Sequence, residues 1–535
     1  MVSSNSVPVI TSAKVDGSGV VQGSINLDIK YNKLFINNEW VDAKSGKTFE
    51  TVNPIDGKVI CSVAEAGAED VDIAVKAARK AFRTVWSKQG PSARAALLLK
   101  LADLIDRDID ELSALESLDN GKTFGIAKVI DTSGVAATMR YWAGFAHGKI
   151  CGRTIEADGP YQMRTVLEPM GVVGAVIPWN FPLLMFAWKL GPAIAAGNCI
   201  IVKTSEKTPL SAYKLAALCG EAGFPPGVIN VLSGYGMPAG NALASHMDVD
   251  KIAFTGSTAT GRKIMEAAAK SNLKKVSLEL GGKSPSIVFP DVNIDDAVEG
   301  THFGMFFNAG QTCCAGTRTF VHESIYDEFV SRATERAKKL KLSYEQNTPF
   351  SQGPQVDKIQ HDKIMNYIET GKKEGAKLQI GGLAGPTGYY IEPTIFSDVQ
   401  DHHTIAKEEI FGPVMSILKW STIDEVIERA NNTPYGLAAS LFCNDISVCN
   451  YVSSQLKAGT VWVNCHNILQ PQAPFGGYKQ SGFGRDNGEY SLIEYSQVKC
   501  ITTKVAEGVP ALPARASAPK ALPEQTERKQ GEVAH

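Results

Sequence analysis

Five short apolar segments, separated by stretches with helical character, constrain the fold of this chain more than any other feature. Short apolar strands that alternate with helices form parallel sheets whose two faces are both covered by helices. The segments are 171–178, 199–203, 228–232, 251–255 and 276–280. We therefore expect an α/β domain built on a parallel sheet.

A second α/β pattern begins after Gly282. A chain of 535 residues exceeds the size of one hydrophobic core, so two such domains agree with its length. Further strands are expected at 34–41, 48–52, 286–289 and 317–321, and helices at 71–86, 93–118, 294–308, 326–340 and 358–374. In the helix at 71–86 the apolar residues recur at helical spacing, which predicts one buried face.

Composition excludes several classes of function. The formal net charge of −2 gives no reason to expect a nucleic acid or an anionic membrane as partner. The chain has no apolar run of about 20 residues, the length that a spanning helix needs. Its ten cysteines are scattered and form no CxxC pair, and there is no HExxH, so we expect reduced thiols in the cytosol and no metal site.

Both ends of the chain differ from the rest. Residues 1–30 contain two aspartates and no arginine, unlike a mitochondrial presequence, which predicts a flexible cytosolic arm. Residues 505–535 carry four prolines among alanines and charges, a composition that predicts a disordered tail.

Three motifs carry groups suited to covalent catalysis. They are Trp179-Asn180-Phe181-Pro182, Glu279-Leu280-Gly281-Gly282 and Gly310-Gln311-Thr312-Cys313-Cys314. A cysteine and a carboxylate base can form and then hydrolyse an acyl-enzyme, and an amide can donate to an oxyanion. Taken singly, each residue has a simpler reading: a buried thiol, a charged strand end or a turn-forming Asn. Spacing alone does not decide between the two cysteines.

A helix N-terminus follows one of the expected strands, at Gly256-Ser257-Thr258-Ala259-Thr260-Gly261. Free N–H groups and the positive end of the helix dipole suit a pyrophosphate. The motif is weaker than GxGxxG, and a plain helix cap is the alternative.

Together these segments resemble the NAD(P)-dependent aldehyde dehydrogenase family, from about Tyr31 to about Lys504. The family pattern Gly-Gln-x-Cys implies that Cys313 is the nucleophile. It implies that Glu279 activates the hydrolytic water, and that Asn180 with the N–H of Cys313 holds the oxyanion. The presence of Glu279 implies release of a free acid rather than an acyl-CoA. The alternative is a non-catalytic relative like a lens crystallin, which is expected to have altered catalytic residues.

The resemblance also assigns a cofactor site. A carboxylate near the adenosine ribose accepts hydrogen bonds from its hydroxyls and repels a 2′-phosphate, so NAD is expected as the preferred cofactor and NADP as the second candidate. The implied cofactor-binding residues are Trp179, Gly256 and Ser257 at the phosphates, Lys203 and Glu206 at the adenosine ribose, and Glu409 and Phe411 at the nicotinamide half.

The substrate tunnel is expected beside Asn180. Phe181, Met185 and Trp188 share one helix face, which in an arbitrary helix would be core packing. The resemblance completes the tunnel with Phe307, Thr312, Asn467, Leu469 and Phe475. None of these residues is a cation, so broad specificity for neutral aliphatic and aromatic aldehydes is expected.

The resemblance implies a Rossmann-like cofactor domain, a second α/β catalytic domain and a small oligomerisation β element. The implied bounds are 1–30 for the arm, 31–149 and 170–281 for the NAD-binding domain, 282–485 for the catalytic domain, 150–169 and 486–504 for the oligomerisation element, and 505–535 for the tail. The expected assembly is a homotetramer, with a homodimer as the alternative, in the cytoplasm.

Overall fold

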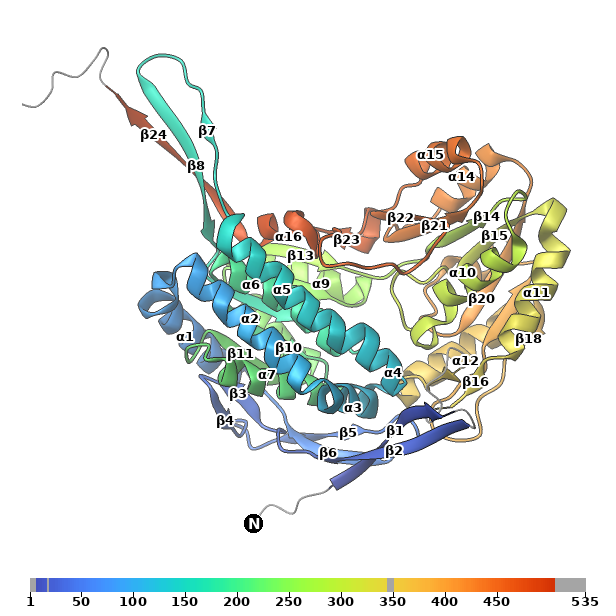
Figure 1. The fold of residues 1–535 in the computed structure, drawn as a ribbon, viewed down its shortest axis with the longest axis horizontal. Coiled ribbons are helices and arrows are strands. Elements are labelled where there is room, and N and C mark those ends of the chain that lie inside the picture. Colours follow the sequence, from blue (N-terminus) through green and yellow to red (C-terminus); the bar gives the residue numbers. More distant parts are fainter. Residues whose placement is uncertain (1–5, 17–18, 344–350, 506–535) are drawn as a thin grey trace, which may run out of the picture. The chain divides into compact units, whose positions relative to one another are not determined.

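The five expected strands form the centre of an eight-stranded sheet in the computed structural model, which describes residues 6–16, 19–343 and 351–505. The sheet has the order β23-β13-β12-β9-β10-β11-β3-β4, and its five central strands are parallel (Figure 1). These are β9 (Val172–Val176), β10 (Cys199–Thr204), β11 (Ile229–Ser233), β12 (Lys251–Thr255) and β13 (Lys275–Glu279). The antiparallel strands are β3 (Leu34–Ile36), β4 (Glu39–Val41) and β23 (Gly482–Phe483).

Helices surround this sheet, and α6 (Pro182–Ala196) is buried along its whole length. It packs against α5 (Ser133–Gly148), which in turn lies beside α2 (Pro91–Arg107) (Figure 1). The other helices are α1 (Ala68–Thr84), α3 (Ile109–Asn120), α4 (Phe124–Ile126), α7 (Leu210–Ala222), α8 (Asn241–Ser245) and α9 (Thr258–Lys270). A π-helix, η2 (Ala127–Thr132), joins α4 to α5.

The single helix expected at 93–118 was wrong, because α2 and α3 are separate helices. Asp108 stands between them with φ −101° and ψ 22°. Its carboxylate pairs with Arg107 at 2.7 Å and with Lys214 at 2.8 Å. The second partner is distant in sequence, so the local pattern did not indicate the break.

The second α/β pattern forms a seven-stranded sheet of order β18-β19-β20-β15-β14-β21-β22, in which only β18 is antiparallel. Its strands are β14 (Pro285–Val288), β15 (Arg318–His322), β18 (Lys377–Ile380), β19 (Thr394–Ser397), β20 (Val414–Trp420), β21 (Ala438–Phe442) and β22 (Thr460–Val463). Its helices are α10 (Ile294–Phe306), α11 (Tyr326–Lys338), α12 (Lys358–Lys373), α13 (Thr404–Lys407), α14 (Ile423–Asn431) and α15 (Ile446–Gln455). The last helix, α16 (Gly488–Glu494), packs against α6 of the first sheet instead.

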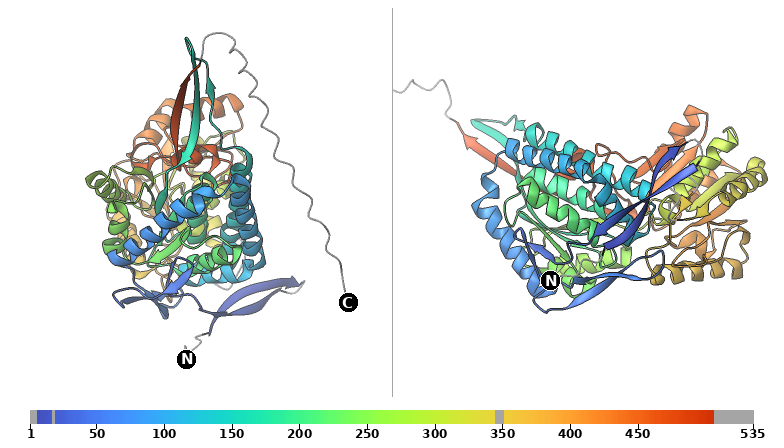
Figure 2. Two further views of the ribbon diagram at one scale, coloured as in Figure 1. Left: turned by 90° about the vertical axis from the view of Figure 1, so that its left-hand side faces the viewer. Right: turned by 60° about the horizontal axis from the view of Figure 1, so that its bottom comes forward.

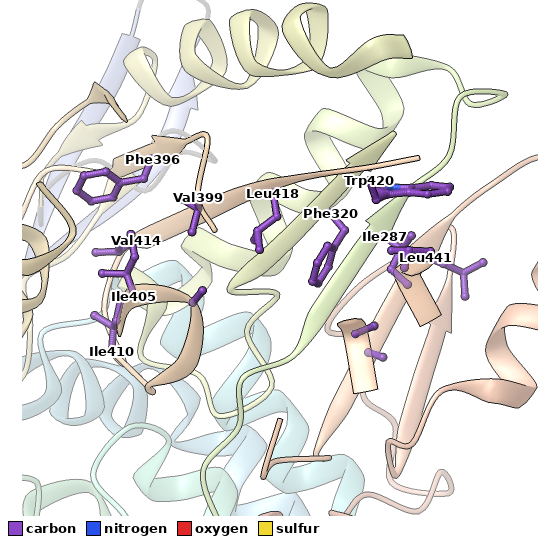
Figure 3. Close-up of a cluster of buried hydrophobic side chains, with 14 of the residues drawn as sticks. Ile287, Phe320, Phe396, Val399, Ile405, Ile410, Val414, Leu418, Trp420 and Leu441 are labelled. Atoms are coloured by element: carbon purple, nitrogen blue, oxygen red, sulfur yellow. The ribbon is translucent and has the colours of Figure 1, made fainter. Parts of the chain in front are cut away.

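A hydrophobic core on this sheet holds the loop around Ile410 in place. Phe320, Leu418 and Trp420 are buried in it, and Ile410 lies at one end near Val414 and Ile405 (Figure 3). Burying one such side chain contributes about 1.5–3 kcal/mol to folding. Because Ile410 is anchored here, the residues on either side of it are held in place.

The segment expected as a flexible arm contains an antiparallel hairpin, β1 (Ser6–Asp16) with β2 (Gly19–Asp28), which its composition did not indicate. The hairpin contacts α3 and α4 (Figures 1 and 2). Short two-stranded sheets are formed by β5 (Thr48–Val52) with β6 (Val59–Ala64), and by β16 (Lys341–Leu342) with β17 (Ser351–Gln352). The expected tail lies outside the described residues, apart from Val505. Within the described part of the chain, no helix is long and apolar enough to cross a membrane.

The chain divides into two compact units, and both large sheets belong to the first of them. The second unit comprises residues 151–167 and those from 498 onward. A three-stranded sheet of order β24-β8-β7 is formed by β7 (Thr154–Ile155), β8 (Tyr161–Pro169) and β24 (Ser496–Lys504). The hairpin and terminal strand expected here are confirmed, while their role in oligomerisation and the domain bounds stay predictions.

Candidate active site

A cavity of about 510 Å³ opens where β9, β12 and β13 end, at the carboxyl edge that open α/β sheets use for ligands. Strand ends of the first sheet, and helices and loops that accompany both sheets, line it, and it gathers nearly all of the predicted site. The predicted residues in its wall are Trp179, Asn180, Phe181, Met185, Trp188, Gly256, Ser257, Glu279, Phe307, Thr312, Cys313, Glu409, Phe411, Asn467, Leu469 and Phe475. Lys203 and Glu206 are not part of the wall; they lie side by side at the end of β10, with Nζ and Oε2 3.7 Å apart.

The loop that carries Cys313 has an unusual backbone. Asn308 and Ala309 have φ of 51° and 54°, a left-handed conformation that costs non-glycine residues about 1–2 kcal/mol each. Gln311 stabilises the turn, because its Nε2 donates to the carbonyl of Asn308 at 3.2 Å and its Oε1 accepts from the N–H of Val356 at 2.9 Å. Strain of this kind is retained where a site requires a fixed geometry.

The two adjacent cysteines occupy different environments. Cys313 is half-buried, whereas Cys314 is buried and its Sγ donates to Oδ1 of Asn467 at 3.3 Å. Contact with the Cys314 thiol, together with burial, raises the pKa of Cys313 well above its usual value. A Cβ on Gly282 would overlap the carbonyl of Cys313, so a glycine is required there. The more exposed thiol is therefore the one that the family pattern selects.

Asn180 lies beside the Cys313 loop, and its Nδ2 donates to the carbonyl of Gln311 at 3.0 Å. Two residues that the sequence reasoning missed hold its backbone. Asn120 donates to the carbonyl of Trp179 at 2.7 Å, and Asn308 donates to that of Asn180 at 3.1 Å. Asn308 stands within the cysteine motif and could have been noticed there, but nothing near Asn120 in the sequence indicated its role.

Glu279 ends β13 with its side chain buried, and its Oε2 has no hydrogen-bond partner among the described residues. Burial and the nearby Asp486 carboxylate raise its pKa well above the usual value. Asp486 forms a buried ion pair with Lys189, which the sequence reasoning also missed. A carboxyl oxygen free of partners at the cavity is available to accept a proton from water once the group is ionised.

The other end of the cavity offers groups that fit a dinucleotide. Ser257 is the N-cap of α9, and its Oγ accepts from the N–H of Thr260 at 3.3 Å. The N-terminus of α9 is exposed at this point, where it can receive a phosphate. Glu409 is partly buried and lies against Gly281, where a Cβ would overlap its carboxylate; its Oε1 accepts from the N–H of Gly282 at 2.9 Å. Trp179 and Phe411 meet edge to face at 5.3 Å. A helix terminus for phosphates, a carboxylate for ribose hydroxyls and flat apolar walls match the parts of NAD.

The predicted tunnel residues form an apolar, aromatic wall. Phe181 stacks on Phe307 at 5.8 Å, and Trp188 contacts Phe475 at 5.5 Å. Leu469 is partly exposed. Another part of the wall was missed: it consists of small or apolar residues of η2 and α5, which a helical pattern alone does not mark as a binding surface. These residues are Val129, Ile130, Ser133, Gly134, Ala137 and Thr138.

One cation lies behind the aromatic wall. Nζ of Lys122 is 4.4 Å from the centre of the Phe181 ring, but it is buried and paired with Glu116 at 3.2 Å and with Asp131 at 3.0 Å. It is therefore neutralised within the protein and turned away from a substrate. Within the described ranges, no cluster of His, Cys, Asp and Glu could hold a metal ion.

Comparisons with known proteins agree with this geometry. The model of the aldehyde dehydrogenase family matches residues 40–501. The human mitochondrial aldehyde dehydrogenase is 58% identical over 89% of this chain and 92% of its own length. Human retinal dehydrogenase 2 is 56% identical over 90% of this chain and 93% of its own. An aldehyde dehydrogenase from Bacillus cereus, solved as an NAD⁺ complex, has a TM-score of 0.87 and 48% identity, covering 89% of this chain and 97% of that one.

Proposed function

This chain belongs to the aldehyde dehydrogenase family, and we propose that it oxidises its substrate through a thioester on Cys313. The enzyme oxidises aldehydes with NAD, as its family does. One observation carries the proposed mechanism: a single cavity holds the half-buried Cys313 thiol, the Asn180 amide and the Glu279 carboxyl, whose Oε2 has no hydrogen-bond partner among the described residues. The absorbance of NADH formed with an aldehyde tests the activity, and its absence would contradict it.

In the proposed mechanism the Cys313 thiol loses its proton to solvent, and the resulting thiolate attacks the aldehyde carbon. The Asn180 amide and the N–H of Cys313 stabilise the oxyanion, and losing one such donor typically costs about 10²–10³ in rate. When bound, NAD accepts the hydride that this carbon loses. Glu279 then removes a proton from water, which attacks the thioester. The carbon–sulfur bond breaks, the carboxylic acid leaves, and the thiol is restored.

NAD is proposed as the preferred cofactor because of Glu206. Its carboxylate, 3.7 Å from Nζ of Lys203, would repel the 2′-phosphate of NADP. Replacing Glu206 by serine leaves Lys203 free to pair with that phosphate. We expect kcat/KM for NADP to rise about 10-fold in Glu206→Ser, which corresponds to about 1.4 kcal/mol, and kcat/KM for NAD to fall. Steady-state kinetics with both cofactors measure this, and Glu221→Ser, on α7, is the control. An unchanged ratio would remove Glu206 from the cofactor site.

The tunnel supports a proposal of broad specificity for neutral aldehydes. The predicted tunnel residues carry no positive charge, and the nearby Lys122 is paired with two carboxylates. Lys363, a cation in the wall of the same cavity, donates to the carbonyl of Glu409 at 3.3 Å, on the cofactor side. Apolar walls discriminate by only about 1–3 kcal/mol per methylene. We expect kcat/KM for hexanal and benzaldehyde to exceed that for succinate semialdehyde. The reverse order in the same assay would show that a cation does reach the tunnel.

The assembly is proposed from the three-stranded sheet, and the compartment from the composition of residues 1–30. The β24-β8-β7 sheet has exposed apolar side chains, among them Val498 and Ile155, which suits a role in a homotetramer or a homodimer. Light scattering on the purified protein distinguishes the two. The cytosol is proposed from the arginine-free residues 1–30, although several relatives are named mitochondrial aldehyde dehydrogenases. Cell fractionation tests it.

A further inference from the structure

An ion pair joins the two α/β domains at the cofactor end of the cavity. Lys207 follows β10 in the first domain, and Asp357 precedes α12 in the second. Their Nζ and Oδ2 atoms are 2.6 Å apart, and the side chains are 21% and 26% exposed. The same Nζ lies 5.3 Å from the centre of the Trp179 ring. A partly buried pair of this kind is screened less than a surface pair.

A series of contacts connects Asp357, through α12, to Trp179. Asp357 caps α12 by accepting from the N–H of Gln360 at 2.8 Å. Nε2 of Gln360 donates to the carbonyl of Phe411 at 2.9 Å, which supports a residue whose φ is 63°. The Phe411 ring then meets Trp179 edge to face. The contacts thus close a ring through Lys207, Asp357, Gln360, Phe411 and Trp179.

Three members of this ring, Trp179, Gln360 and Phe411, line the cavity, whereas Lys207 and Asp357 do not. The ion pair therefore acts on a ligand only through the other three. The ion pair draws the two domains together at this end of the cavity. A dinucleotide bound there could leave only if the two domains moved apart or if it passed between them. Ion pairs between elements that must part for release affect dissociation more than association.

We propose that these five residues form a clasp that retains the dinucleotide, in which Lys207 and Asp357 are positioning residues that slow its release. The proposal rests on the proposed function, since it takes NAD(H) as the ligand. Lys207 holds Trp179 at this end of the cavity through the contact of its charge with the ring, and Asp357 holds both Lys207 and the N-terminus of α12. The Gln360 side chain, which α12 carries, holds the Phe411 backbone through its hydrogen bond to the Phe411 carbonyl.

The test uses the full-length enzyme and NADH alone, without aldehyde. The variants are Lys207→Met, Asp357→Asn and their combination. Asparagine still caps a helix, so Asp357→Asn removes the charge and keeps the cap. The matched control is Lys358→Met, which breaks an exposed pair with Asp362 at 2.6 Å on the same helix. Stopped-flow fluorescence gives the NADH dissociation rate, a titration gives Kd, and thermal melting reports the fold.

We expect NADH to dissociate about 3- to 10-fold faster from each single variant. The double variant should be no faster than the faster single variant, because either change already breaks the ring of contacts. The NADH association rates and the melting temperatures of the variants should equal those of the wild type. The control variant should release NADH at the wild-type rate. Raising the salt concentration should narrow the difference between wild type and variants, since the pair is partly exposed.

An unchanged dissociation rate in both single variants, with NADH still bound tightly, would overturn the clasp and leave the proposed function intact. Additive effects in the double variant would also overturn it, because the two residues would then act separately. A wild-type enzyme that binds no NADH would overturn the clasp together with the proposed cofactor site. Unfolding of Lys207→Met would leave Asp357→Asn, with its cap retained, to decide the question.

Discussion

Replacing Cys313 by alanine is expected to lower aldehyde oxidation by about 10⁴-fold or more, the scale seen when a covalent nucleophile is removed. The alanine cannot form a thioester, and the neighbouring Cys314 thiol is held by Asn467. NADH formation under saturating aldehyde and NAD measures the loss. Binding of NADH should survive, because the cofactor end of the cavity does not use the sulfur.

Cys314→Ser is the matched control for this variant. It keeps a hydrogen-bond donor toward Asn467 and leaves the Cys313 thiol in place, so most of the activity should remain. Mass spectrometry of the enzyme quenched during turnover locates the acyl group. An acyl group on Cys314, or full activity of Cys313→Ala, would reverse the assignment of the nucleophile.

Glu279→Gln should separate the two halves of the reaction. The change removes the base and nearly preserves the shape of the side chain, and Oε2 has no hydrogen bond to lose within the described structure. Hydride transfer should proceed once, while hydrolysis of the thioester should slow by about 10²–10⁴-fold. The expected record is a burst of NADH, close to one per active site, followed by very slow turnover.

Rapid mixing with quenched-flow analysis follows this burst. Glu266→Gln, which breaks an exposed pair with Lys270 on α9, serves as the control and should turn over normally. The base has a raised pKa, so hydrolysis in the wild type should weaken as the pH falls, because the protonated carboxyl cannot accept a proton. Normal steady-state turnover in Glu279→Gln would show that another group activates the water.

The sequence predicted the parallel strands because each is a short apolar run, and β12 was placed with its exact bounds, Lys251–Thr255. It predicted Cys313, Glu279 and Asn180 as a set because each stands in a distinctive motif. It did not predict Lys189 beside Asp486, since 297 residues separate them and only the closed fold brings them together. The break at Asp108 was missed for the same reason, because its partner Lys214 belongs to another helix.

The pairing of β13 with β23 has a consequence for synthesis of the chain on the ribosome. Leu278 and Glu279 pair with Phe483 and Gly482, so the edge of the first sheet is completed by a strand made about two hundred residues later. At about 5–20 residues per second, that edge stays open for roughly 10–40 s while the second domain is made. An uncovered parallel-sheet edge is prone to pair with other chains. The nascent enzyme is therefore most vulnerable to aggregation in that interval, and chaperones that bind exposed strands should engage it there.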